Sequence, residues 1–134
     1  MTFDVEKFYI DFTDRAIYDK LEKEFPKKFT KKDLFMFALI TGYKSKIRIP
    51  LEKRQEFFWA SNLKPEDEII IKSIAVTENE NIDILQDNEK LIGIAQDYAR
   101  GGISIIKKTL EQHGSFVKYI EKEISDKSEE HGWT

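Results

Sequence analysis

Lysine and arginine side chains are concentrated in residues 27–54, and their plainest chemistry is the binding of phosphate groups. This stretch holds nine cations against two acids, although the whole chain of 134 residues has 22 cations and 25 acids. A local excess of positive charge on an acidic background bears on binding partners more than on folding. The nine candidate nucleic-acid-binding residues are Lys27, Lys28, Lys31, Lys32, Lys44, Lys46, Arg48, Lys53 and Arg54.

The first four cations, between residues 27 and 32, gather at the start of a predicted helix that Thr30 can cap. Cations at a helix N-terminus oppose the macrodipole, and no compensation is visible in the sequence. Free backbone N–H groups and four lysines would together suit a phosphate group of DNA. The alternative is that these lysines fill an exposed loop and are screened by salt. Because only this cluster breaks a helix rule, it is the primary candidate, and residues 44–54 form the second.

The chain offers little for catalysis. It has no cysteine, and His113 precedes Gly114 at a predicted helix end, where an imidazolium offsets the dipole. Gly101-Gly102 lacks the further glycine and the Lys-Ser/Thr of a phosphate-binding loop. Acidic residues near 83–89 are typical of a solvated surface. We therefore predict a protein that is not an enzyme and that has no metal and no cofactor.

Size and composition indicate one soluble domain. An apolar fraction of 40% with ten phenylalanines supports a real core, and a charged fraction of 35% describes a solvated surface. The N-terminus does not resemble a signal peptide, and no apolar stretch is as long as a membrane span. We expect a cytoplasmic protein with one helical domain at 1–127 and a flexible tail at 128–134 that contains Trp133.

The elements that must position the cations begin with a half-buried strand at 6–12. Alternation there points Phe8, Ile10 and Phe12 inward, and Lys7, Tyr9 and Asp11 outward. A helix over 14–24 follows, capped by Thr13 and ended by Pro26. The next helix covers about 31–41, with Gly42 as its left-handed stop.

Helices dominate the second half of the chain. Residues 55–60 predict either a strand or one helical turn, and a helix from Pro65 runs to about Val76. A polar loop covers 78–86. Asp87 caps a helix over 88–100, which Gly101-Gly102 ends, and two further helices carry Ile103–Leu110 and Phe116–Ile124. The fold class is therefore mainly α, a compact domain of about five helices with one or two short β-strands.

Two other modes of nucleic-acid binding are open. The order strand, helix, helix is similar to that of ribbon-helix-helix DNA-binding regulators, which would present Lys7, Tyr9 and Asp11 to the major groove. Several aromatic residues could instead stack on single-stranded bases, although the apolar run around Phe35 and Phe37 favours a buried core. The aromatic residues are Phe35, Phe37, Phe57, Phe58 and Trp59.

Two segments resemble a known family. The run from Phe29 to Tyr43 followed by Ile49-Pro-Leu51, and the later Asp97-Tyr-Ala-Arg-Gly-Gly-Ile-Ser-Ile-Ile106, are similar to small proteins associated with DNA phosphorothioation (Dnd) systems. Ile69–Ala75 and Asn81–Leu85 fall in similar order between them. The resemblance covers roughly residues 14–110 and contains no catalytic motif.

The resemblance implies an accessory protein of a system that replaces a DNA phosphate oxygen with sulfur or restricts unmodified DNA, in antiviral defence. It implies contact with the DNA backbone, with other proteins of such a system, or with both. The competing class is a pure protein-interaction module whose basic face binds an acidic partner. A homodimer is a further possibility.

Overall fold

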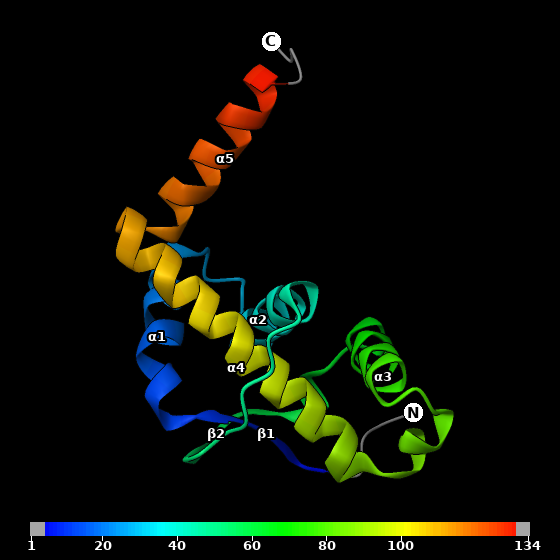
Figure 1. Ribbon diagram of the computed structural model, residues 1–134. Helices are drawn as coiled ribbons and strands as arrows, with labels where there is room; N and C mark the ends of the chain where they lie inside the picture. Colours follow the sequence, from blue (N-terminus) through cyan, green and yellow to red (C-terminus); the bar gives the residue numbers. More distant parts are fainter. Residues whose placement is uncertain (1–4, 131–134) are drawn as a thin grey trace.

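Five α-helices and one small sheet make up the described part of the computed structural model, which covers the backbone of residues 5–130 and side chains through residue 126 (Figure 1). The predicted mainly α class is confirmed. The strands are β1 (Lys7–Asp11) and β2 (Arg54–Trp59), and the helices are α1 (Arg15–Glu24), α2 (Lys31–Ser45), α3 (Pro65–Asn79), α4 (Asn88–His113) and α5 (Phe116–Glu130). Short 3-10 turns are η1 (Phe12–Asp14), η2 (Ala60–Asn62) and η3 (Ile82–Gln86).

Helix α4 is the long central element, and it corrects the prediction that Gly101-Gly102 ends a helix. The helix continues through both glycines to His113, where Gly114 adopts a left-handed conformation with φ 75°. A Cβ at Gly102 would lie 1.8 Å from the Ala38 carbonyl oxygen of α2. Gly102 therefore lets the backbones of α4 and α2 touch, and this contact compensates for its poor intrinsic helix propensity.

Gly42 has the same role on the opposite helix, so its predicted function as the end of α2 is wrong. A Cβ there would lie 1.9 Å from the Tyr98 carbonyl oxygen. Helix α2 continues to Ser45, and Lys46 takes the left-handed conformation instead, with φ 56°. Leu34, Phe35 and Leu39 fill the core on this face of α2.

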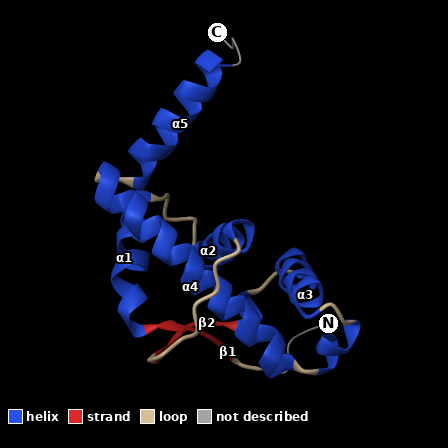
Figure 2. Ribbon diagram, in the orientation of Figure 1, coloured by secondary structure: helices blue, strands red, loops and turns tan. Residues whose placement is uncertain are grey.

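The sheet is a single antiparallel pair, shown in red in Figure 2. Phe8 and Ile10 point into the core as predicted, and Phe8 stacks on Phe58 with ring centroids 4.9 Å apart. The alternation fails after Ile10: Asp11 is buried, whereas Phe12 is 58% exposed in η1. The Asp11 side chain turns inward to accept hydrogen bonds, and β1 and its alternation of inward and outward side chains end at this residue.

Local capping rules account for most helix starts. Thr30 and Asp33 form a capping box on α2, and the Asp87 side chain accepts from the Lys90 amide at the start of α4, as predicted. The predicted cap of α1 is wrong, because Thr13 donates to Asp11 and does not cap the helix.

Helix α5 projects away from the other helices (Figure 1). Phe116 at its start is buried, but Ile124 is 61% exposed. The backbone is helical to Glu130, whereas Trp133 and the rest of 131–134 lie outside the described residues, so the flexibility of the tail stays a prediction. In the described part of the chain, no helix combines the length and apolar character needed to cross a membrane.

Candidate nucleic-acid interface

The nine candidate cations fall into two clusters at opposite ends of helix α2. Residues 27–32 lie at its N-terminus, and residues 44–54 begin in its last turn and lead into β2. Fifteen helical residues at 1.5 Å each separate the two ends by about 22 Å. The structure therefore does not bring the nine cations into one patch.

Lys32 in the first cluster is a structural residue. Its side chain is 7% exposed, and its ammonium lies 2.8 Å from an Asp67 carboxylate oxygen and 3.0 Å from one of Asp33. Burial disfavours the charge, but the hydrogen bonds to these two carboxylates outweigh burial and raise the pKa of Lys32. Its charge is already paired within the protein.

The unfavourable position of Lys32 at the N-terminus of α2 is compensated by two acidic side chains in the folded structure. Asp33 closes the capping box and also pairs with Lys32, while Asp67 reaches it from the first turn of α3. Lys31 lies over the Phe57 ring at 5.9 Å, and Lys27 and Lys28 are exposed. Asp33 and Asp67 therefore account for Lys32, whereas Lys27, Lys28 and Lys31 form no ion pair within the described residues.

The second cluster, hereafter the basic loop (residues 44–54), is held against α4. The Ile49 amide donates to the Asp97 carbonyl at 3.0 Å, and the Arg100 guanidinium donates to the Pro50 carbonyl. Gly101 lies so close to Ile47 that an added Cβ would be 1.9 Å from the Ile47 carbonyl oxygen. One short segment of α4 thus fixes the path of the loop.

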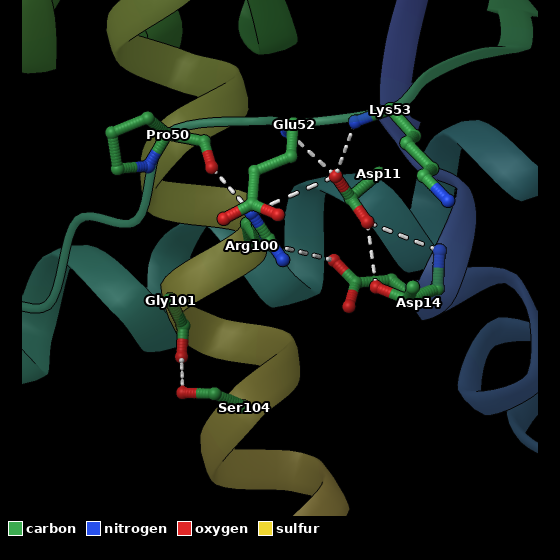
Figure 3. Close-up of polar contacts among 9 residues, drawn as sticks. Asp11, Asp14, Pro50, Glu52, Lys53, Arg100, Gly101 and Ser104 are labelled. Carbon is green, nitrogen blue, oxygen red and sulfur yellow. Dashed lines mark hydrogen bonds and ion pairs between the residues drawn. The ribbon is translucent and has the colours of Figure 1, made fainter.

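Asp11 holds the other end of the basic loop (Figure 3). One of its carboxylate oxygens accepts from the Glu52 amide at 2.7 Å and the Lys53 amide at 2.9 Å. The other oxygen accepts from the Thr13 amide and hydroxyl. The Arg100 guanidinium lies 3.6 Å from the oxygen that binds the Glu52 and Lys53 amides. Burial alone would raise the pKa of Asp11, but the bonds from Thr13, Lys53 and Glu52 lower it well below the ordinary value.

The Asp14 carboxylate also lies near Arg100, 3.8 Å from its Nε atom. Burial raises the pKa of Asp14 to about 6, and the positive charge of Arg100 opposes this rise. Arg100 therefore lies near one carboxylate that is ionised well below neutral pH and another that titrates close to pH 6. The arrangement serves to position the loop.

Arg48 is also fixed. It lies 2.9 Å from a Glu78 carboxylate oxygen, 3.7 Å from one of Asp97, and over the Tyr98 ring at 5.5 Å. The hydrogen bond from the Tyr98 hydroxyl at 2.6 Å is the main reason why the pKa of Glu78 is lowered, followed by the bond from Arg48. Because both acids share its charge, Arg48 contributes less to an external field than its sequence position suggests.

The remaining cations of the basic loop face solvent. Lys44, Lys46, Lys53 and Arg54 are all exposed, and Arg54 lies over the Tyr9 ring at 4.8 Å. No ion pair involves any of these four side chains within the part of the chain that the structure describes. A fixed backbone that carries exposed cations is an arrangement suited to phosphate groups.

Sequence reasoning missed the residues that position the loop. Alternation placed Asp11 on the outer face, and nothing in its neighbours signals a buried carboxylate. Arg100 and Gly101 carried a usable signal, because both lie in the segment 97–106 that supported the family resemblance. Their role in positioning the loop could be predicted only with the knowledge that α4 continues through the glycines.

The structure also bears on the ribbon-helix-helix and aromatic-stacking hypotheses. The ribbon-helix-helix arrangement is absent from the described chain: β1 pairs with β2 of the same chain, and Gln96 accepts from the Tyr9 amide at 2.8 Å. The preference for a buried core around Phe35 and Phe37 is confirmed for Phe35, and Phe37 is partly buried and packs against the core. Phe57 and Phe58 are also buried, whereas Trp59 is 53% exposed. Among the described residues, no group of three or more histidine or carboxylate side chains could hold a metal ion.

Comparison with known proteins supports the resemblance seen in the sequence. No curated protein and no solved structure matches the chain. One family model, described as DNA sulphur modification system-associated protein 4, matches residues 16–133. This match spans most of the chain, including both ends of α2 and the segment of α4 that holds the basic loop. The chain therefore belongs to the family of DNA sulphur modification system-associated protein 4.

Proposed function

We propose that this protein is a non-enzymatic accessory factor of a DNA phosphorothioate modification or restriction system and that it binds the DNA backbone through the basic loop. The family match supports the association with a DNA sulphur modification system. The observation that carries the proposal is the loop itself, whose backbone is fixed by Asp11 and Arg100 while Lys44, Lys46 and Lys53 face solvent.

The fixed backbone matters because binding then costs little additional ordering of the loop. A flexible lysine-rich loop would lose conformational freedom on every encounter with DNA, which weakens binding. Here the loop backbone is already ordered in the folded protein, by hydrogen bonds to the buried Asp11 carboxylate and by the close contact at Gly101. The lysines then contribute mainly through release of counterions from the phosphates.

Binding of this kind carries no sequence information. Phosphate contacts fix register and orientation on a duplex, whereas base contacts specify sequence. The protein would therefore hold another protein of the modification or restriction system on DNA and leave site selection to that partner. Antiviral defence would be the setting of the system as a whole. The homodimer that the sequence left possible stays a prediction.

The experiment compares two charge-removal variants in binding to a labelled duplex of about 20 base pairs at low salt. Lys44→Gln/Lys46→Gln/Lys53→Gln removes the exposed lysines of the basic loop. Lys27→Gln/Lys28→Gln/Lys31→Gln removes the same number of charges at the other end of α2. We expect the first variant to lose binding by at least tenfold and the second to retain it.

Two outcomes would contradict the proposal. The first is that the wild-type protein shows no binding to any duplex at low salt. The second is that the two variants lose binding equally, since nonspecific attraction to total charge would then explain the effect. If DNA is not bound but the loop variant loses a protein partner from the native host, the protein-interaction class replaces this proposal.

A further inference from the structure

A polar cleft lies beside the basic loop, between the two-stranded sheet and the first half of α4. Its volume is about 550 Å³, within the usual range for small-molecule sites. Residues that line it include Tyr9, Arg54, Glu56, Glu89, Gly93 and Gln96. Arg54 belongs to both the cleft and the basic loop, so a strand held on the loop would pass the mouth of the cleft.

The wall formed by the sheet presents the Arg54 guanidinium, which the Tyr9 ring supports. Arg54 lies 4.8 Å from the centroid of Tyr9, and the Tyr9 backbone is fixed by its hydrogen bond to the buried Gln96 side chain. The neighbouring cation, Lys7, is engaged with Glu56 at 2.7 Å and with the Trp59 ring at 4.6 Å. Planar guanidinium groups and aromatic rings are the surfaces on which unpaired bases stack.

The opposite wall leaves room for a flat ligand. Gly93 lines the cleft in the middle of a helical turn, and a Cβ built there would meet nothing within 4 Å. This sets Gly93 apart from Gly101 and Gly102, where close backbone contacts leave no space for a Cβ. The absence of a side chain at Gly93 has no packing reason, and it keeps the cleft open.

The polar lining favours one chemical class of base. Glu56 is already paired with Lys7, whereas the Glu89 carboxylate can only accept hydrogen bonds when ionised, so it suits an exocyclic amino group. Cytosine presents such a donor at N4, whereas thymine presents the O4 acceptor at the same place. A carboxylate facing O4 would gain no hydrogen bond.

We propose that this cleft binds an unpaired nucleobase with an exocyclic amino group, stacked on Arg54 while Tyr9 supports the guanidinium. The inference rests on the proposed function, because a DNA strand on the basic loop would deliver the base. Glu89 accepts from the amino group, and Lys53 and Arg54 lie beside the phosphates of the same strand. The protein then recognises DNA whose bases are locally unpaired.

The test measures binding of labelled oligo(dC), oligo(dT) and a length-matched abasic strand at pH 8 by fluorescence anisotropy. The wild-type protein is expected to bind oligo(dC) about tenfold more tightly than the abasic strand, in keeping with the usual worth of one stacked base. Oligo(dT) should bind more weakly than oligo(dC). All three strands carry the same backbone charge, so differences among them report on the base.

Two variants separate the cleft from the basic loop. Arg54→Lys keeps the positive charge but removes the stacking plane, so it should abolish the preference for oligo(dC) over the abasic strand. Gly93→Leu fills the cleft from the helix and should have the same effect. Gly93→Ala is the matched control, since one methyl group leaves most of the volume free.

Titration with dCMP by calorimetry distinguishes a free nucleotide from a strand. If the wild-type protein binds dCMP and Gly93→Leu does not, a free nucleotide is sufficient to occupy the cleft. If the wild-type protein binds oligo(dC) but not dCMP, the cleft requires a strand. Equal affinity for oligo(dC) and oligo(dT), or a preference that survives both Arg54→Lys and Gly93→Leu, would overturn the inference. If the loop lysine variants leave duplex binding intact while the cleft variants act as expected, the proposed function fails and the cleft stands.

Discussion

Single charged residues divide into those that fix the structure and those that remain available to a ligand, and their partners decide which. Asp11 and Lys32 are both buried, and each makes several polar contacts within the protein. Lys44 and Lys53 are equally charged but exposed. Charge counts along the sequence cannot separate these two kinds, because the Glu52 amide that binds Asp11 lies 41 residues further along the chain.

Replacing Lys32 tests this division directly. Lys32→Met keeps most of the buried stem but leaves the Asp67 carboxylate, which is 15% exposed, without its cation. We expect a loss of about 1–3 kcal/mol in the free energy of unfolding, measured by urea denaturation. Lys31→Met is the matched control and should change stability by less than about 0.5 kcal/mol. Equal effects from the two variants would show that Lys32 is not a structural residue.

Asp14 gives the protein a pH dependence of defined sign. Its pKa rises from the ordinary value of 3.8 to about 6 in the folded protein. Between these values the folded state binds more protons than the unfolded state, so the contribution of Asp14 to stability falls as pH rises from 4 to 6. The loss is at most about 2–3 kcal/mol for a shift of this size.

The variant Asp14→Asn removes this contribution. The stability of the variant relative to the wild-type protein should therefore increase by about 1–2 kcal/mol between pH 4 and pH 7 in urea denaturation series. Asp19→Asn, at an exposed position on α1, is the matched control for the loss of one carboxylate. A constant difference between Asp14→Asn and the wild type across this range would mean that Asp14 titrates normally.

At the scale of elements, the contact between α2 and α4 determines where the basic loop lies. Gly42, Gly101 and Gly102 allow carbonyl groups to approach where any side chain would collide. The sequence correctly placed the caps at Thr30 and Asp87, because capping depends on residues three positions apart. It misjudged these glycines, because a helix-ending glycine and a helix-packing glycine differ only in what faces them.

Two alanine substitutions in the same helix separate packing from propensity. Gly102→Ala would place a Cβ 1.8 Å from the Ala38 carbonyl oxygen, so the helices must move apart. We expect a loss of more than about 3 kcal/mol, read out as a lower melting temperature or failure to fold. Gly93→Ala meets nothing within 4 Å and should stabilise the protein by about 0.5–1 kcal/mol. Similar effects from both would refute the close helix contact.

At the scale of the whole molecule, the fold class was predictable and the charge distribution was not. Amphipathic periodicity indicated helices and a short strand, and the structure has both. The excess charge of residues 27–54 falls in one region of the sequence, but its two clusters begin at opposite ends of α2. Charges that are close in the sequence can lie far apart in space when a rigid helix of about 22 Å separates them.

The dependence of DNA binding on salt tests the central claim most directly. The slope of log affinity against log salt concentration reports the number of phosphates that the protein neutralises, at about 0.9 for each. Relative to the wild type, Lys44→Gln/Lys46→Gln/Lys53→Gln should reduce this slope by about 2.7, and Lys27→Gln/Lys28→Gln/Lys31→Gln should leave it unchanged. A slope that is the same for the wild type and the loop variant would contradict the account, because the basic loop would then make no contact with phosphate.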